Sequence, residues 1–252
     1  MLKSPPTPPS RIAWIDSAKS IAMVVMVIDH ALLYLGDQSH WMRATITRVA
    51  EPLFVLALFH VLVSRRRGLA RRRWLQIAIA SAIETALHSY RAGEFFFGIL
   101  FSVAIVAPIV QRIANSNFMH QQCLVFGATV LAVVEIGPSS FHIDYGPSLL
   151  VGQICIASQL TINQRCLNLV SISIGATFAT ACILCAGGMP VSPNLGTLLI
   201  GQPVAIAFLW GLRLSHSSGR DRRGWIGRHP LTFYLGHLGL LQFLASLAAE
   251  AP

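Results

Sequence analysis

Long apolar runs recur along this chain, and the charged residues lie mostly between them. Of the 252 residues, 54% are hydrophobic and only 12% are charged, whereas an average soluble domain has about 25% charged residues. A helix needs about 20 mostly apolar residues to cross a bilayer. The runs are too long for the strands of a membrane barrel and lack their alternation. The sequence therefore predicts an all-α fold, a polytopic bundle of transmembrane helices.

We expect about nine spans in a single integral membrane domain, residues 1–252, with a Pro-rich cytoplasmic tail at residues 1–11. The expected spans are residues 12–35, 46–63, 74–87, 95–113, 123–136, 145–160, 167–186, 195–212 and 231–249. Pro108 and Pro203 fall inside spans, where we expect them to kink the helix. No internal repeat and no soluble domain is visible in the sequence.

The basic residues predict the topology. The side that holds the N-terminus carries Lys3, Arg11, Arg65, Arg66, Arg67, Arg71, Arg72, Arg73, Arg112, Arg165, Arg213, Arg220, Arg222, Arg223 and Arg228. The other side has only Arg43 and Arg91, with Arg48 at a helix start. Loops rich in Lys and Arg stay in the cytoplasm, so we expect the N-terminus inside and the C-terminus outside. The same rule explains the net charge of +9 without nucleic-acid binding.

The pair Asp29-His30 is the most unusual feature of the first run, because ionisable residues are costly inside a bilayer and usually functional there. Spacings of 3, 4, 3 and 4 put His30 on one helix face with Asp16, Lys19, Met23 and Met26. The alternative is structural, with Asp16 pairing with Lys19 and His30 bonded to a neighbouring helix. We interpret the stripe as functional, facing the interior of the bundle.

Further polar residues are expected at the outer level of His30. Arg48 and Glu51 open the second span, and Glu84 and His88 end the third. Glu135, His142 and Asp144 follow near the outer end of the fifth span. A histidine among carboxylates can act as a general base. The simpler interpretation of Glu84, Glu135 and His142 is solvation at the membrane surface, and we favour it for each.

The last span holds Tyr234 and His237 on one face. We expect His237 about two turns inside the cytoplasmic boundary, as a packing histidine or a second catalytic group. The five cysteines are an odd number and all lie in or beside apolar segments, so we expect no disulfide framework. Cys182 and Cys185 have a redox or metal spacing, but they fall inside an expected helix, where we interpret them as buried small hydrophobic residues.

Several segments resemble the TraX family. They are residues 16–22 (DSAKSIA), 26–30 (MVIDH), 47–54 (TRVAEPLF), 145–146 (YG) and 233–237 (FYLGH). The resemblance covers nearly the whole chain in order and length. The sequence departs from the family pattern at Glu51, where Phe is usual, and at Thr47, where Gly is usual. This departure leaves open a different acceptor or a relative that does not transfer acetyl.

The resemblance implies a membrane-embedded N-acetyltransferase in the inner (cytoplasmic) membrane of a bacterium. It would move acetyl from cytoplasmic acetyl-CoA, as co-substrate, to a periplasmic-side acceptor, first of all the N-terminus of a conjugative pilin. His30 matches the family's motif histidine and would act with Asp29 and Arg48. Glu51, Tyr234 and His237 would support them, and Lys19, Arg65, Arg66 and Arg67 would contact the cofactor phosphates. The simpler interpretation of the arginine runs, which we favour, is that they set the topology and contact anionic lipid. We expect no metal and no haem.

Other functions remain open. The acceptor could be a sugar or polysaccharide. A proton-coupled transporter would use the buried Asp, His and Glu as a relay, although no inverted repeat is visible. A haem carrier would use His30, His60, His88 and His237, but His60 and His30 are expected at different depths. A non-enzymatic subunit of a secretion machine is the remaining alternative.

Overall fold

A computed structural model describes residues 13–35, 46–64, 70–92, 95–134, 141–143, 146–162, 166–188, 195–215, 226 and 229–250. These residues form nine continuous helical segments, when helices and turns that directly adjoin are counted as one, together with one small sheet. The elements are α1 (Ala13–Leu35), η1 (Ile46–Val49), α3 (Ala50–Ser64), α4 (Arg71–Ala92), β1 (Phe95–Phe97), α5 (Ile99–Val106), η2 (Ala107–Ile109), α6 (Val110–Ala114), α7 (Phe118–Val134), β2 (Phe141–Ile143), α8 (Pro147–Ile162), α9 (Cys166–Ala186), η3 (Thr197–Gly201), α10 (Gln202–Ser215) and α12 (Pro230–Glu250). The prediction of an all-α fold is confirmed.

Five helices in this part of the chain are long and apolar enough to cross a membrane. They are Ala13–Leu35, Thr47–Ser64, Cys166–Ala186, Thr197–Ser215 and Pro230–Ala248, and two shorter apolar helices are Ile99–Ala114 and Phe118–Val134. Several long apolar helices in one chain are the mark of a multi-pass membrane protein.

The outward faces of these helices are apolar. On α1, Ile21, Val24 and Ile28 are exposed, while Met23 and Met26 on the other face are buried. Large apolar side chains spread along an exposed helix face fit a lipid environment better than water. The expected burial of Cys182 and Cys185 is wrong, because both lie on an exposed face of α9, where lipid would replace a protein core.

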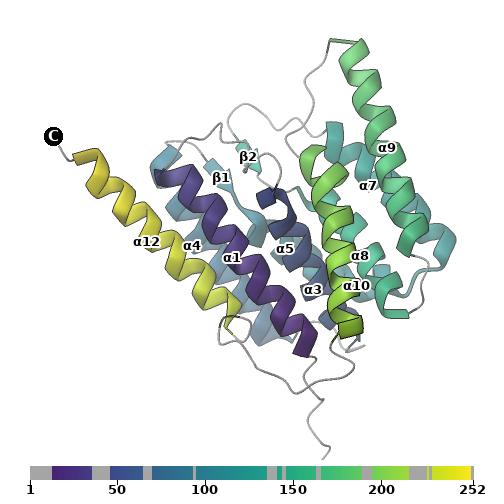
Figure 1. The fold of residues 1–252 in the computed structure, drawn as a ribbon, viewed down its shortest axis with the longest axis horizontal. Coiled ribbons are helices and arrows are strands. Elements are labelled where there is room, and N and C mark those ends of the chain that lie inside the picture. Colours follow the sequence, from purple (N-terminus) through teal and green to yellow (C-terminus); the bar gives the residue numbers. More distant parts are fainter. Residues whose placement is uncertain are drawn as a thin grey trace, which may run out of the picture.

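Helix α3 lies at the centre of the bundle. It packs against α1, α8 and α10, and nearly all of its side chains are buried. Helix α1 also packs against α12, and α12 contacts α4, so α1, α4 and α12 form one group (Figure 1). In Figure 1, α1 begins at the lower end of the bundle, and α12 runs from the lower end to the upper left.

The two prolines disturb their helices as expected. Pro108 lies in η2, a 3-10 turn between α5 and α6. Pro203 lies in the first turn of α10, directly after the π-helical turn Thr197–Gly201. Because proline has no N–H to give the carbonyl one turn earlier and its ring crowds that carbonyl, the preceding turn widens to the π form, which occurs as single turns within helices.

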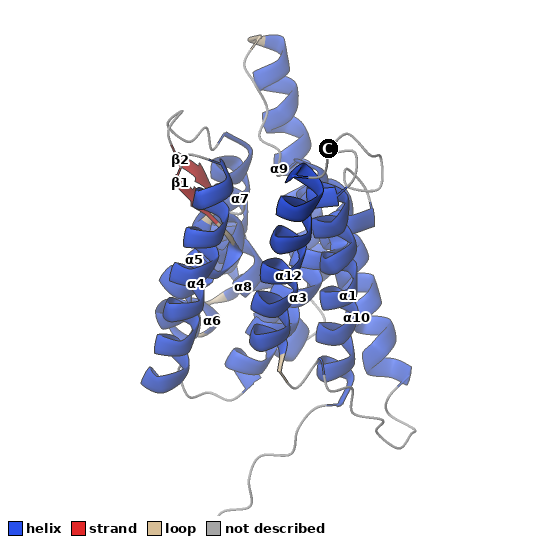
Figure 2. Cartoon of the chain, turned by 90° about the vertical axis from the view of Figure 1, so that its left-hand side faces the viewer, coloured by secondary structure: helices blue, strands red, loops and turns tan. Residues whose placement is uncertain are grey.

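Two short strands pair at one end of the bundle, at the top of Figure 2. Strand β1 lies parallel to β2, with Phe95 opposite Phe141 and Phe97 opposite Ile143. β1 leads into α5 through Gly98, the N-cap residue of that helix. The sheet therefore fixes the start of α5 at the end of the bundle where α4 finishes.

Candidate functional site

The polar stripe of α1 turns inward as the sequence predicts. Its later members Met23, Met26 and His30 are all buried, and Tyr34 continues the same face one turn beyond His30. Asp16 and Lys19, nearer the start of the helix, are half-buried. The 3.6-residue period therefore gives the face correctly, and the neighbours on that face come from α4 and α12.

His30 contacts His237 across the interface between α1 and α12. The Nδ1 atom of His30 lies 2.8 Å from Nε2 of His237, and the two rings stack with centroids 5.1 Å apart. Both side chains are buried, each only 8% exposed. This contact contradicts the expectation that His237 lies nearer the cytoplasmic end than His30. His30 lies 17 residues after the start of α1 and His237 only 7 after the start of α12, so α12 is offset along α1 by about 15 Å.

The contact made by Nδ1 of His237 determines which nitrogen atoms of the pair carry protons. Nδ1 of His237 lies 3.0 Å from the backbone oxygen of Phe233. A carbonyl oxygen only accepts, so Nδ1 of His237 carries the proton and Nε2 is an acceptor. His30 must then donate its Nδ1–H to His237. When both rings are neutral, the basic lone pair of His30 is therefore on Nε2, the nitrogen that can take a proton in a reaction.

Glu84 of α4 lies against the same group. It is fully buried at 0% exposure, accepts a hydrogen bond from the hydroxyl of Tyr234, and accepts the Leu100 backbone N–H at 3.1 Å. Tyr234 in turn lies with its ring centroid 6.0 Å from His30. The expectation that Glu84 is solvated at the membrane surface is wrong, because the first turn of α5 and the last helix enclose it.

Gly98 leaves the space that the Glu84 carboxylate occupies. A Cβ atom at Gly98 would lie 2.2 Å from a carboxylate oxygen of Glu84. The backbone at Gly98 is extended, with φ −80°, so the need for glycine is one of room and not of conformation. The approach of α5 to α4 at this point is what lets the α5 backbone reach the carboxylate.

Tyr34 and His88 add a second polar pair beside His30. The hydroxyl of Tyr34 lies 2.9 Å from Nδ1 of His88, and the side-chain amide of Gln242 donates to that hydroxyl at 3.4 Å. The ring centroid of His88 lies 6.4 Å from that of His30. We call His30, Tyr34, Glu84, His88, Tyr234 and His237 the α1–α4–α12 cluster. Tyr34 was missed in the sequence, although its position four residues after His30 was a signal.

Asp29 points to a different neighbour from His30. Its Oδ1 atom accepts the hydroxyl of Thr47 at 2.6 Å, and it is half-buried. Successive helical residues diverge by about 100° around the axis, so Asp29 faces η1 while His30 faces α12. Arg48, half-buried, follows Thr47 in η1. A Cβ at Gly201 would lie 2.1 Å from the Arg48 carbonyl oxygen, so glycine lets η3 approach this turn.

Glu51 lies in the first turn of α3 and is more deeply buried than Asp29 or Arg48. It is 1% exposed, and its Oε2 atom accepts the side-chain amide of Gln153 at 3.2 Å. The residue that departs from the family pattern is therefore matched by a polar partner on α8. This hydrogen bond joins the start of α3 to α8.

Some predicted residues fall outside the described part of the chain. Arg65, Arg66, Arg67, Glu135 and Asp144 belong to this group, and of His142 only the backbone is described. His60 lies apart from His30, bonded to Thr161, as the depth argument expected. Among the described residues, no group of three His, Cys, Asp or Glu side chains is placed to hold a metal ion.

Comparison with known proteins gives one family. Neither a curated protein nor a solved structure matches the chain. The family model described as TraX protein matches residues 15–245, which include every described residue of the α1–α4–α12 cluster. The match covers most of the sequence, and the chain belongs to the TraX protein family.

Proposed function

We propose that this protein is a membrane-embedded N-acetyltransferase, with His30 as the general base. It takes acetyl from acetyl-CoA on the cytoplasmic side and gives it to an acceptor on the periplasmic side, first of all the N-terminus of a conjugative pilin. Membership of the TraX family supports the reaction class. The observation that carries the role of His30 is the chain of contacts from its Nδ1 through His237 to the Phe233 carbonyl.

That chain of contacts suits a general base. With Nδ1–H donated to His237, His30 presents Nε2 as its basic atom. When Nε2 takes a proton, the ring becomes a cation, and His237 with the Phe233 carbonyl stabilises it through two hydrogen bonds. His237 is then a positioning residue, which holds the ring and its tautomer. Asp29 was expected in that role; its contact with Thr47 suggests that it orders η1 instead.

The reaction can be written with its protons balanced. The neutral amine of the acceptor attacks the thioester carbonyl carbon, and an N–C bond forms while the carbonyl oxygen gains negative charge. Nε2 of His30 takes the proton from that nitrogen. The C–S bond then breaks, and the CoA thiolate leaves and receives the proton from His30. Arg48, in the turn that Thr47 ties to Asp29, would stabilise the oxyanion.

The length of α1 sets a requirement on the donor. His30 follows Trp14, in the first turn of the helix, by 16 residues, or about 24 Å along the axis. With the N-terminus inside and nine spans in the inner membrane, His30 lies in the outer half of the bilayer. The acetyl group must therefore travel deep into the bundle, carried on the long pantetheine arm, before it meets the base.

A direct assay tests the proposal. The purified protein in lipid nanodiscs is mixed with acetyl-CoA and a peptide carrying a free N-terminal amine, and CoA thiol release and peptide mass are followed together. We expect one acetyl group per peptide and one thiol per acetyl. A parallel arm offers an oligosaccharide, and acetyl on the sugar alone would replace the amine acceptor. No thiol release with any acceptor, together with proton uptake by proteoliposomes, would instead favour a transporter.

A further inference from the structure

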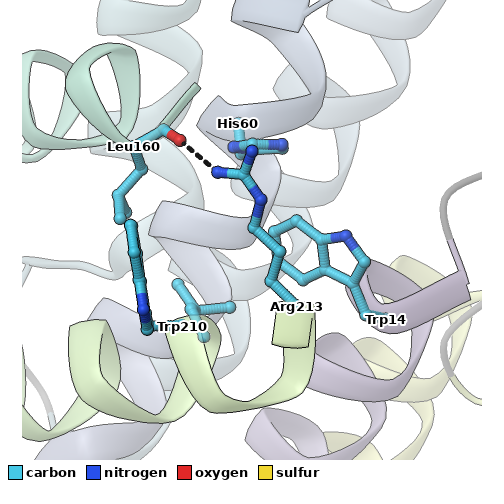
Figure 3. Close-up of a pocket in the computed structure, with 6 residues that line it drawn as sticks. Trp14, His60, Leu160, Trp210 and Arg213 are labelled. Atoms are coloured by element: carbon cyan, nitrogen blue, oxygen red, sulfur yellow. Dashed lines mark hydrogen bonds between the residues drawn. The ribbon is translucent and has the colours of Figure 1, made fainter. Parts of the chain in front are cut away.

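A second group of aromatic and charged side chains lines a pocket at the other end of α1 from His30. The pocket is lined by Trp14, His60, Leu160, Leu209, Trp210 and Arg213. Figure 3 shows the Arg213 side chain extending between Trp14 and Trp210, with its guanidinium beside His60 and directed toward the Leu160 carbonyl. These residues come from the start of α1 and from the last turns of α3, α8 and α10. The pocket therefore lies at the end of the bundle where α1 begins and α10 ends, which the topology predicted from the sequence places in the cytoplasm.

Arg213 is held in place without losing its charge. Its Nη1 atom donates to the backbone oxygen of Leu160 at 2.9 Å, and its Cζ atom lies 5.9 Å from the Trp210 ring centroid. The acceptor is a neutral carbonyl in the last turn of α8, where a helix has carbonyls without an intrahelical partner. The guanidinium has five N–H donors, and this bond uses one. An exposed cation remains, with its plane fixed by a carbonyl and an indole.

The back wall of the pocket is rigid as well. The hydroxyl of Thr161 donates to the Ala157 oxygen at 2.8 Å, so its oxygen accepts the Nδ1–H of His60 at 2.9 Å. The His60 ring then meets the Trp14 ring edge-on, with centroids 4.9 Å apart. Three helices are joined by these contacts before any ligand binds, and a site prepared in this way loses little ordering entropy on binding.

The pocket itself is small, about 10 Å³. We propose that the exposed Arg213 guanidinium, at the rim of the pocket lined by Trp14, His60 and Trp210, binds the phosphate group of a phosphate ester. A guanidinium offers paired N–H donors that match phosphate oxygens, and the indoles favour the apolar or aromatic part attached to the phosphate. Two sources carry that chemistry at this end of the bundle: an anionic lipid headgroup and a phosphate of acetyl-CoA. The proposal does not depend on acetyl transfer, because phosphate binding is measured without a reaction.

The alternative is that Arg213 only caps α8. Arg213→Gln separates the two roles, since glutamine can still donate to the Leu160 carbonyl but has no charge. Arg213→Lys keeps the charge and loses the paired donors. Arg112→Gln is the matched control, because Arg112 is also an exposed arginine in the last turn of a helix, α6, and does not line the pocket.

The test is a titration followed by tryptophan fluorescence, with the full-length protein in nanodiscs of neutral lipid. One arm adds acetyl-CoA, a second adds inorganic phosphate, and a third incorporates increasing phosphatidylglycerol. We expect a saturable change in at least one arm, weakened about tenfold or more in Arg213→Gln, weakened less in Arg213→Lys, and unchanged in Arg112→Gln. Saturation with acetyl-CoA identifies the co-substrate as the source, and saturation only with phosphatidylglycerol identifies lipid. Equal titrations for wild type and both Arg213 variants, or no saturable change in any arm, would overturn the proposal.

Discussion

His30 and His237 stack with their ring planes inclined by only 16°, and Nδ1 of the first lies 2.8 Å from Nε2 of the second. Two neutral imidazoles can share a proton in this way only if one donates and the other accepts. The Phe233 carbonyl determines that His30 is the donor, because it accepts the Nδ1–H of His237 and leaves Nε2 of His237 as an acceptor. A backbone oxygen on α12 therefore determines which nitrogen of a residue on α1 is basic.

Removing His237 should slow acetyl transfer without abolishing it. His237→Ala leaves the His30 ring without its partner, so both orientation and tautomer are lost, and misplacement of a catalytic group costs on the order of 10²-fold. His237→Gln, whose side-chain oxygen can accept the His30 Nδ1–H, should recover part of the rate. The measurement is kcat and KM of thiol release in nanodiscs. A fall in kcat at constant KM is expected; equal rates for wild type and His237→Ala would show that the contact has no role in turnover.

Gly98→Ala should destabilise the protein. The added Cβ would lie 2.2 Å from a Glu84 carboxylate oxygen, so the carboxylate must move and lose the Leu100 N–H. Leaving a buried polar group unsatisfied costs about 1–3 kcal/mol, and overpacking costs a similar amount. Gly239→Ala is the control, because a Cβ there meets nothing within 4 Å. Thermal unfolding in detergent should show a lower midpoint for Gly98→Ala only, and equal midpoints would contradict the packing described here.

Asp29→Asn separates charge from hydrogen bonding. Asparagine keeps an oxygen for the Thr47 hydroxyl, which now donates to Asp29 at 2.6 Å, but it removes the negative charge beside η1. If the charge sets the position and electrostatics of Arg48, turnover should fall by on the order of 10-fold or more. The thermal midpoint should change little, because asparagine still accepts the Thr47 hydrogen bond. Thr47→Val is the companion variant. Normal turnover in Asp29→Asn would leave Asp29 a purely structural role.

The topology predicts the location of two loop positions. Reporter fusions at Leu69, between the arginine triplets, and at Asp144, near the second strand, should report cytoplasm and periplasm respectively, because basic loops remain inside. A pair of enzymes active on opposite sides of the membrane makes the measurement. The reverse result at either position would refute nine spans with the N-terminus inside.

The sequence predicted the faces of helices better than their neighbours. Periodicity alone put Met23, Met26 and His30 on the buried side of α1, since that period is a property of one helix. The contact between His30 and His237 was not predicted, because the offset of α12 along α1 depends on packing between helices far apart in the sequence.

Buried polar residues were the hardest to interpret. Glu84 looked like a solvated residue near a helix end, but the Leu100 N–H and Tyr234 enclose it. The Leu100 N–H can donate to Glu84 because it belongs to the first turn of α5, where backbone donors have no intrahelical partner. That turn follows a short strand whose pairing with β2 joins segments more than 40 residues apart (Phe95 with Phe141), and such a pairing leaves no local pattern in the sequence.

The most direct test of the account is mass spectrometry of the acceptor with His30→Ala. General-base catalysis contributes about 10²–10⁴-fold, so the acetylation rate should fall by that order in a protein that still inserts and folds. His120→Ala, which removes an exposed histidine at the start of α7, should acetylate at the wild-type rate. Full acetylation of the acceptor by a correctly inserted His30→Ala protein would contradict the assignment of His30 as the base.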